Sequence, residues 1–269
     1  MPEPLPSDLA RALHATAPRR GAIGKPAYYF SETTSTNDIA AAYAEQGAPE
    51  GTTIVAASQT AGRGRLGRTW YSPPGAGLYM SVVLRQARVA PYLTLAGGVA
   101  VAEGVRAATG LPVEIKWPND VVTRERSGGT RRRKLAGVLA EASSAADNIQ
   151  HVILGIGINL LSTAYPPEIA DRASSIETEL GRSVEAGPVF GEVLAALSAQ
   201  IAPLLRGDAS GLLSRWRALA PSAQGAPVEF EGADGRIAGV AAGIADDGAL
   251  LVRVGDRLER VISGEILWK

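Results

Sequence analysis

The spacing of apolar residues alternates along the chain between the three-to-four-residue rhythm of helices and the shorter runs of strands. The helical rhythm predicts helices at Ser7–Ala17, Asn37–Gln46, Pro91–Thr109, Gly187–Arg206 and Ser210–Leu219. Short β-branched or continuously apolar runs predict strands at Tyr28–Ser31, Thr52–Ser58, Gly77–Leu84, Val113–Trp117, Val121–Thr123, Leu135–Ala142 and Gln150–Leu160. Residues 26–221 therefore predict one α+β unit, a mixed β-sheet flanked by helices.

The pattern changes after Pro221. Short strands follow one another closely, separated by Gly/Asp turns, at Pro227–Glu231, Arg236–Ile244, Ala249–Val254 and Arg257–Ile262. This spacing predicts a small β-barrel over residues 222–269. At the other end, residues 1–25 hold one short helical pattern that stops at Pro18, so we expect a short N-terminal helical extension.

Composition and charge exclude several functions. The 269 residues carry no net charge, so the sequence gives no overall electrostatic reason to expect nucleic acid or a membrane surface as a partner. With no cysteine and two histidines, disulfides, thiolate metal sites and a cysteine nucleophile are excluded, and a Ser-His-Asp triad is disfavoured. Any metal should be Mg²⁺, held by oxygen ligands and substrate phosphates.

No targeting or spanning segment is evident in the pattern. The chain opens with acids and prolines, and its longest apolar stretch, residues 92–111, is interrupted by Glu103 and Arg106. We therefore expect a cytoplasmic protein.

One stretch, Gln59–Trp70, concentrates glycine and arginine without an acid. Its residues 62–67 match the G-x-G-x-x-G dinucleotide fingerprint, but Thr69-Trp70-Tyr71-Ser72-Pro73-Pro74 cannot open the helix that this fingerprint requires. Glycine-rich turns present backbone N–H groups to anions, and arginine binds phosphate through two nitrogens. The stretch indicates an anion-binding loop, with a flexible surface loop as the alternative.

Three further stretches carry polar residues among apolar strands: Lys116–Asp120, Lys134–Glu141 and Gly155–Leu160. The first could be a structural turn with an exposed ion pair. The asparagine in the third needs a partner, which could be backbone or ligand. Between the first two lies a basic segment, residues 124–134, which predicts a mobile, solvated hairpin tip of unknown role.

Together these stretches resemble one family, the biotin–protein ligases, also called biotin–[acetyl-CoA-carboxylase] ligases. The matching motifs, in order, are Ser35-Thr36-Asn37, the Gly/Arg stretch, Lys116-Trp117-Pro118-Asn119-Asp120, Lys134-Leu135-Ala136-Gly137 and Gly155-Ile156-Gly157-Ile158-Asn159. The run ending at Ser263-Gly264-Glu265 resembles the family's small SH3-like domain. The resemblance covers about residues 27–269, and it implies a class II synthetase-like catalytic domain followed by an SH3-like barrel.

The resemblance also implies roles for individual residues. Biotin would be bound by Ser35, Thr36, Gln59, Gly62, Arg63, Lys134 and Gly137. The nucleotide would be bound by Arg65, Arg68, Trp70, Lys116, Asn119 and Asn159. The catalytic groups would be Lys134, Arg65, Lys116 and Asp120. Asp120 would serve either Mg²⁺ on the ATP phosphates or the incoming lysine, and the sequence does not decide between them.

The implied reaction is the ATP-dependent activation of biotin as biotinyl-5′-AMP, with release of pyrophosphate, and transfer to a lysine of a biotin carboxyl carrier protein. The loop of residues 62–70 is expected to order only around biotin and the adenylate, since fixing each residue costs about 1–2 kcal/mol. A lipoate or octanoyl ligase of related fold is one alternative. A biotin-responsive DNA-binding regulator is another, disfavoured because 25 residues leave no room for a helix-turn-helix domain. The family resemblance allows for a homodimer.

Overall fold

The structure, a computed structural model, describes residues 1–124, 132–145, 148–232 and 235–268. Most of the basic segment at 124–134, for which a mobile hairpin tip is predicted, therefore lies outside the described residues.

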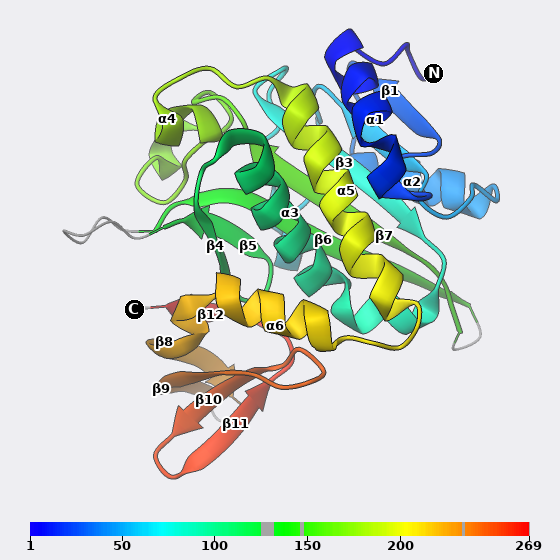
Figure 1. The fold of residues 1–269 in the computed structure, drawn as a ribbon. Coiled ribbons are helices and arrows are strands. Elements are labelled where there is room, and N and C mark those ends of the chain that lie inside the picture. The colour runs from blue at the N-terminus through cyan, green and yellow to red at the C-terminus, as the bar shows by residue number, and fades with distance from the viewer. Residues whose placement is uncertain (125–131, 146–147, 233–234, 269) are drawn as a thin grey trace.

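A seven-stranded mixed sheet forms the centre of the molecule (Figure 1). Its strand order is β1-β2-β3-β7-β6-β5-β4, and β1 and β2 run parallel while the other neighbours are antiparallel. The strands are β1 (Ala27–Phe30), β2 (Thr53–Ala56), β3 (Gly77–Leu84), β4 (Val113–Lys116), β5 (Asp120–Thr123), β6 (Lys134–Ala145) and β7 (Asn148–Asn159). The predicted mixed sheet is confirmed, with β3 spanning the predicted residues.

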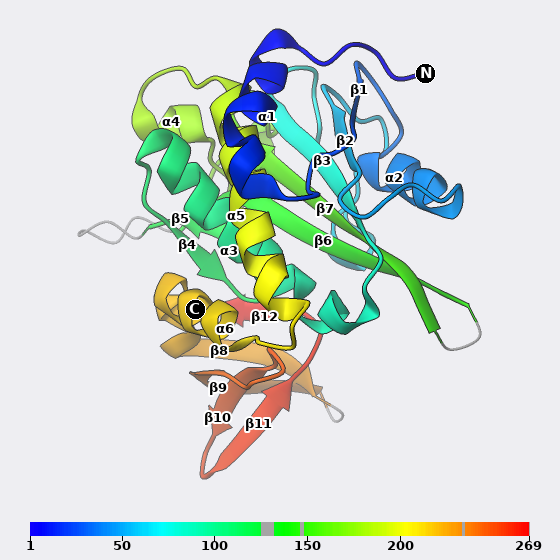
Figure 2. The ribbon, with the colours of Figure 1, turned by 45° about the vertical axis from the view of Figure 1, so that its right-hand side comes forward.

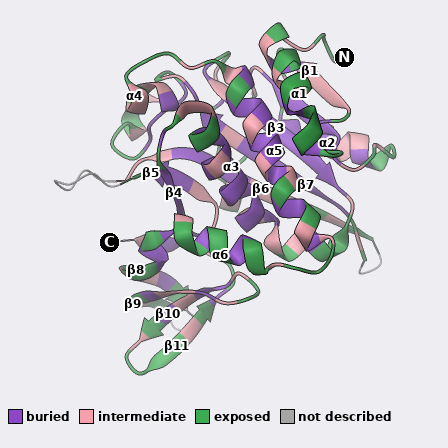
Figure 3. Cartoon of the chain, viewed as in Figure 1, coloured by how far each residue is buried: buried purple, intermediate pink, exposed green. Residues whose placement is uncertain are grey.

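Helices cover the two faces of this sheet unequally. In Figure 1, α1 (Ser7–Arg20), α3 (Leu93–Thr109) and α5 (Ala186–Leu204) lie in front of the sheet and form the large apolar core with it. On the other face, α2 (Thr36–Glu45) packs over a smaller apolar cluster that includes Ile54, Val83 and Ile153. Side chains alternate between the faces along a strand, so β2, β3 and β7 each contribute to both layers. Figure 3 shows the buried residues concentrated in the sheet and in α3 and α5.

Two helices differ from the predicted spans. The sequence predicted that α1 ends before Pro18, but the helix continues to Arg20. Arg20 is buried and donates hydrogen bonds to the carbonyl oxygens of Leu13 and Ile23, so tertiary contacts stabilise a last turn that proline alone would disfavour. A short helix, α4 (Ile176–Leu180), was not predicted; Ser175 caps it by accepting a hydrogen bond from the Thr178 backbone N–H.

Among the described residues, α5 is the one helix long and apolar enough to cross a membrane by length and composition. However, 61% of the apolar stretch of this helix is buried inside the protein, where the helix packs against α1 and α3. It is a core helix. The apolar stretch singled out in the sequence, residues 92–111, is largely α3, which is also buried.

The C-terminal part is a five-stranded antiparallel sheet below α6 (Ser210–Leu219) in Figure 1. Its order is β11-β10-β9-β8-β12, with strands β8 (Gln224–Gly232), β9 (Gly235–Ile244), β10 (Leu250–Val254), β11 (Arg257–Val261) and β12 (Ile266–Trp268). The predicted small C-terminal β domain is confirmed. In the described residues its edge strands β11 and β12 do not pair with each other, so the sheet is open. The turned view in Figure 2 shows this sheet as a layer beneath the central one.

Side-chain contacts attach the C-terminal sheet to the rest of the protein. The indole N–H of Trp117 donates to the Gly248 carbonyl oxygen at 3.1 Å, and Tyr92 donates to the Asp246 carbonyl oxygen at 3.2 Å. Both acceptors lie in the turn between β9 and β10, which therefore rests against the end of β4 and the start of α3.

Candidate functional site

A pocket lies on the α2 face of the central sheet, between β6, β7, the start of α2 and the Gly/Arg stretch Gln59–Trp70, which we call the Gly/Arg loop. The structure places most of the predicted site residues around it: Ser35, Thr36, Gln59, Arg63, Arg65, Trp70, Asn119, Lys134 and Gly137. The free volume is only about 50 Å³. Pockets for small organic ligands usually measure about 300–1,000 Å³. An adjoining hollow along the same loop, next to Leu139 and Glu141, measures about 650 Å³.

Glycines form the floor of this pocket. Gly137 on β6 and Gly157 on β7 are partners across the sheet, and the ring of Trp70 lies on both. A Cβ atom would meet that ring at 2.8 Å from position 137 and at 2.6 Å from position 157, so both positions require glycine for this packing. The indole N–H of Trp70 is buried and has no hydrogen-bond partner within the described part of the chain.

One end of the pocket presents neutral polar groups. Ser35 stands at the N-cap position of α2, but its side chain makes no capping hydrogen bond, so the hydroxyl is available. The Gln59 side-chain oxygen accepts from the Thr36 backbone N–H at 2.8 Å, and its Nε2 donates to Ser72 Oγ at 2.8 Å. Gly62 packs on this amide, because a Cβ there would lie 2.9 Å from Gln59 Nε2.

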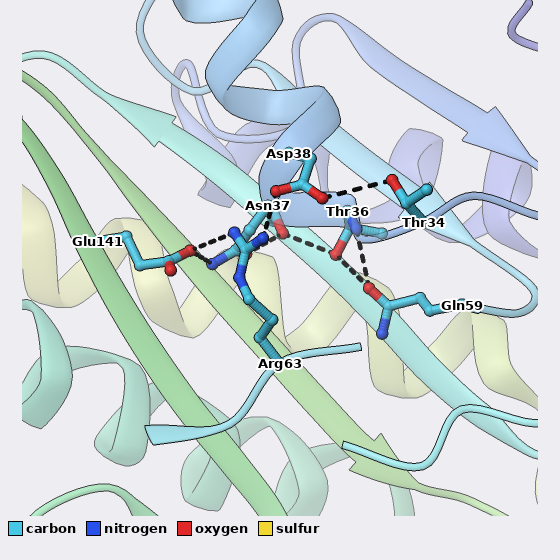
Figure 4. A network of polar contacts seen from close by, with 8 residues as sticks. Thr34, Thr36, Asn37, Asp38, Gln59, Arg63 and Glu141 are labelled. Carbon is cyan, nitrogen blue, oxygen red and sulfur yellow. Dashed lines mark hydrogen bonds and ion pairs between the residues drawn. The ribbon is translucent and has the colours of Figure 1, made fainter. Parts of the chain in front are cut away.

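Ion pairs anchor the Gly/Arg loop near the same end (Figure 4). Arg63 pairs with Asp38 of α2 and, at 2.9 Å, with Glu141 of β6. The hydrogen bond to Glu141 is the main reason that the pKa of Arg63 is raised. The sequence reasoning counted no acid near the loop, because both carboxylates come from distant segments. These pairs help to hold the loop over the pocket.

The other end of the pocket is charged. Lys134 Nζ lies 2.6 Å from Asp120 Oδ1 and 5.1 Å from the centre of the Trp70 ring, a cation–π distance. Arg65 donates to Asn119 Oδ1 at 3.3 Å, and burial lowers its pKa. Lys116 and Asp120 face each other in register across β4 and β5. Two cations and a carboxylate thus lie together where the resemblance predicts the phosphates.

The tip of the loop reaches the C-terminal sheet. Arg68 pairs with Glu265 at 2.6 Å, and Arg65 also donates to the Gly264 carbonyl oxygen at 3.4 Å. The hydrogen bond from Arg68 lowers the pKa of Glu265, with smaller electrostatic contributions from Arg236 and Lys116. Gly62 and Arg68 line a second hollow under the loop, next to the first pocket.

Asn159 is the predicted site residue that the structure uses elsewhere in its own fold. Its side-chain nitrogen donates to the Ser174 carbonyl oxygen at 2.9 Å, and Asn159 is absent from the lining of the pocket. Of the two partners left open by the sequence, backbone is the one seen here. A role of Asn159 toward the nucleotide stays a prediction.

Several residues of the site were missed by sequence reasoning. Asn37 and Glu141 stood inside quoted motifs without a role, and Gly155 and Gly157 were noted only as glycines. Glycine at alternate positions of a buried strand was the available signal, since it marks a close approach to one face. Glu265 stood at the end of a quoted run without a role, and nothing in the sequence distinguished Ser81 or Asp38.

The site offers little to a metal by itself. Among the described residues, no group of three His, Asp or Glu side chains could hold a metal ion. Among the described residues, Asp120 is the carboxylate that contacts Lys134 at the charged end. Mg²⁺ commonly binds proteins through one or two carboxylates and takes its remaining ligands from substrate phosphates and water. These residues fit an ion that is brought by the nucleotide.

Comparison with known proteins agrees with this geometry. The Biotin/lipoate A/B protein ligase family matches residues 29–159, and the Biotin protein ligase C terminal domain matches residues 225–267. The biotin–[acetyl-CoA-carboxylase] ligase of Mycobacterium tuberculosis is 34% identical over 88% of this chain and 86% of its own. The bifunctional ligase/repressor BirA of Bacillus spizizenii is 32% identical over 91% of this chain and 74% of its own.

Solved structures give the same result. The biotin protein ligase from Aquifex aeolicus, in complex with biotin and ATP, superposes with a TM-score of 0.77 at 30% identity, over 91% of this chain and 99% of that one. This chain belongs to the biotin/lipoate A/B protein ligase family. Within the family its relatives are the biotin protein ligases, as the sequence motifs predicted.

Proposed function

We infer that this chain is an ATP-dependent biotin–protein ligase. It converts biotin to biotinyl-5′-AMP with release of pyrophosphate, and then transfers biotin to a lysine of a carrier protein. The observation that carries this conclusion is the division of one pocket, with neutral hydrogen-bonding groups at Thr36 and Gln59 and clustered cations at Arg65 and Lys134. A lipoate or octanoyl ligase is not favoured, because the named relatives act with biotin.

The neutral end is proposed to hold the cyclic urea of biotin. Ser35, Thr36 and Gln59 offer hydroxyl and amide groups to its N–H and carbonyl, while Gly62, Arg63 and Gly137 close around the rings. The carboxylate of biotin then points toward Lys134. A ligand with a neutral head and an anionic tail matches a pocket that is neutral at one end and cationic at the other.

The charged end is proposed to hold ATP and to catalyse the first step. Lys134 and Arg65 bring the biotin carboxylate and the α-phosphate together and stabilise the charge that develops as an oxygen of the carboxylate attacks phosphorus and pyrophosphate leaves. Arg68, Trp70, Lys116, Asn119 and Asn159 are the proposed further nucleotide contacts. Bound Mg²⁺ would neutralise phosphate charge there.

The second step requires no protein nucleophile. The ε-amine of the acceptor lysine attacks the activated carbonyl, the C–O bond to AMP breaks, and the amine loses a proton. Asp120 is proposed either to assist that lysine or to contact Mg²⁺. Its ion pair with Lys134 supports both roles.

The Gly/Arg loop is proposed to act as the cover of the pocket. The loop lines both the pocket and the adjoining hollow, and the acidic partners of Arg63 and Arg68 hold it there, which supports this role. We propose that the loop opens to admit biotin and closes over the adenylate, shielding the mixed anhydride from water. Equal protease sensitivity of the loop with and without biotin plus ATP would contradict this.

The organisation and setting of the enzyme are proposed as follows. Residues 26–221 form the catalytic domain and residues 222–269 the small C-terminal domain, a division supported by the separate matches at 29–159 and 225–267. The acceptor is a biotin carboxyl carrier protein, and the reaction takes place in the cytoplasm, where ATP is available. A homodimer stays a prediction.

Pyrophosphate exchange into ATP tests the proposed function directly. We expect exchange that depends on biotin, and none when lipoate or octanoate replaces it. Transfer is then measured by adding a purified carrier domain and detecting biotin on its lysine. Absence of exchange with biotin would refute the proposal, and exchange with lipoate alone would replace it with the alternative.

A further inference from the structure

The neutral end of the pocket continues into a buried network of polar side chains that the proposed function does not use. Asn37, at the start of α2, and Ser81, in the middle of β3, are almost inaccessible to solvent, at 4% and 0% exposure. The network runs from Glu141 through Asn37 and Ser81 to Thr36 and Gln59; Figure 4 labels all of these except Ser81.

The orientation of the Asn37 amide is set by Glu141. The side-chain nitrogen of Asn37 donates to Glu141 Oε2, and the same carboxylate oxygen accepts from Arg63 at 2.9 Å. A carboxylate that accepts from a guanidinium presents only acceptors. Turning the Asn37 amide over would place Asn37 Oδ1 against Glu141 Oε2, two acceptors without a proton between them. Asn37 Oδ1 must therefore face Ser81.

Gly155 makes room for this arrangement. A Cβ atom at position 155 would lie 2.3 Å from Asn37 Oδ1 and 3.0 Å from its Cγ and Nδ2. Any other residue there would displace the amide. The close contact between Asn37 of α2 and the backbone of β7 therefore requires glycine at position 155.

Counting protons fixes the direction of the remaining hydrogen bonds. Three oxygen–oxygen contacts follow: Ser81 to Asn37 Oδ1 at 2.6 Å, Ser81 to Thr36 Oγ1 at 2.7 Å, and Thr36 to Gln59 Oε1 at 3.1 Å. The two hydroxyls supply one proton each, since the amide oxygens can only accept. Two oxygen atoms without a proton between them repel each other least at the longest distance, so the contact from Thr36 to Gln59 is the one left without a proton. Ser81 then donates to Asn37, and Thr36 donates to Ser81.

The consequence for the pocket is a defined polarity. With its proton directed at Ser81, Thr36 Oγ1 can offer only a lone pair to a ligand. Gln59 has its oxygen occupied by the Thr36 backbone N–H, so it offers the second hydrogen of its Nε2. One acceptor and one donor side by side are complementary to an N–H next to a C=O, the two groups of a cyclic urea.

We propose that Glu141, Asn37 and Ser81 are positioning residues that determine specificity by fixing Thr36 as a hydrogen-bond acceptor. They select a ligand with N–H beside C=O and reject one with an oxygen in place of that N–H. This inference rests on the proposed function, because biotin supplies the cyclic urea. Glu141 acts from outside the lining of the pocket, through Asn37 and Ser81.

The test compares biotin with a cyclic carbamate analogue in which one ring N–H is replaced by oxygen, prepared in both orientations and measured by titration calorimetry. Because each replaced hydrogen bond leaves two facing acceptors, we expect the wild type to bind the worse carbamate about 10- to 100-fold more weakly than biotin. The readout is the ratio of two dissociation constants, that of the worse carbamate divided by that of biotin.

Two variants of Glu141 separate orientation from charge. Glu141→Gln and Glu141→Met both lose the ion pair with Arg63, but only the glutamine keeps an oxygen that can accept from Asn37. We expect the ratio to stay near the wild-type value in Glu141→Gln. In Glu141→Met the Asn37 amide and the Thr36 hydroxyl can turn, and we expect the ratio to shrink about 3- to 10-fold.

A second pair checks the relay inside the sheet. Ser81→Ala removes the hydroxyl that links Asn37 to Thr36, and it should shrink the ratio about as much as Glu141→Met does. Thr53→Val removes another fully buried hydroxyl, one strand away, which donates to the Gly51 carbonyl oxygen and does not contact the network. This variant should leave the ratio unchanged. Should Ser81→Ala fail to fold, the Glu141 pair still decides.

The outcomes are distinct. Biotin binding that weakens equally with carbamate binding in Glu141→Met and Ser81→Ala would show a purely structural role and overturn the inference. A wild type that neither binds biotin nor exchanges pyrophosphate would overturn the proposed function instead.

Discussion

The two ends of the pocket meet their proposed ligand groups by different physical means. At the Thr36 end, buried neutral groups are held in one orientation by a network that extends below the surface. At the Lys134 end, charged groups are partly exposed, with a third of the Lys134 side chain accessible to solvent. Buried neutral hydrogen bonds discriminate by geometry, whereas exposed charges attract with little selectivity. Recognition and reactivity are thus assigned to opposite ends of one pocket.

The largest expected effect comes from the charged end. Lys134→Ala removes the cation beside Asp120 and should lower kcat/KM for pyrophosphate exchange about 100- to 1,000-fold, as expected for the loss of a group that stabilises developing charge. Lys134→Arg keeps the charge and should retain more activity. Binding of biotin alone, measured by calorimetry, should weaken far less. A loss below tenfold would show that Lys134 is not part of the chemistry.

The floor of the pocket should respond next. In Gly157→Ala the new methyl group would lie 2.6 Å from the Trp70 ring, so the ring must shift. Overpacking of about 1–3 kcal/mol predicts that the dissociation constant for biotin rises about 5- to 100-fold. Gly98→Ala is the matched control, since its methyl group would make ordinary contact with Ile115 at 3.6 Å on the other face of the sheet. Equal effects of both variants would contradict this account of the floor.

Salt should weaken ligand binding at the two ends of the pocket to different extents, and this test needs no mutation. Raising NaCl from about 0.05 to 0.5 M shortens the screening length from about 14 to 4 Å, which weakens exposed charge pairs most. We expect ATP to bind about 3- to 10-fold more weakly, and biotin to change less than twofold. Calorimetric titrations at several salt concentrations measure both. Parallel salt dependence would show that the two ends do not differ as described.

The smallest effect is expected at the contact between the loop and the C-terminal sheet. A double-mutant cycle with Arg68→Ala and Glu265→Ala should give a coupling of about 0.2–1 kcal/mol at pH 7, as for other exposed pairs. The pKa of Glu265 is lowered in the folded protein. The contribution of this carboxylate to the free energy of unfolding is therefore complete at a pH above the usual glutamate pKa, and it is lost as the pH falls through the lowered pKa. Urea unfolding between pH 7 and pH 3.5 checks this; a coupling that grows on acidification would contradict the assignment.

The sequence predicted elements well where one apolar pattern dominated. β3 and α6 have the predicted limits, because each is a continuous pattern bounded by glycine, proline or serine. β12 and α4 were missed, since three or five residues are too few to establish a rhythm. The small C-terminal β domain followed from strand spacing and from the family resemblance, and neither says whether the edge strands meet.

The site was predictable as a set of motifs but not as a set of contacts. Motif order brought Thr36, Gln59, Arg65 and Lys134 together correctly, as the pocket lining shows. The acids that hold the Gly/Arg loop are 25 and 78 residues away from Arg63 in sequence. Such pairings depend on strand register and helix placement, and local patterns contain neither.

The packing of α1 along α5 has a practical consequence. Gly187 donates its backbone N–H to Asp8 at 3.1 Å, and Arg19 forms an ion pair with Glu192 at 2.6 Å, so the first helix covers one side of the most apolar helix of the protein. Leu9 is 4% exposed in that interface. A shortened chain that begins after Arg20 would present an apolar helix face to water. Its first symptom should be poor solubility during expression and purification, so a variant lacking α1 would be a misleading reagent for judging catalysis.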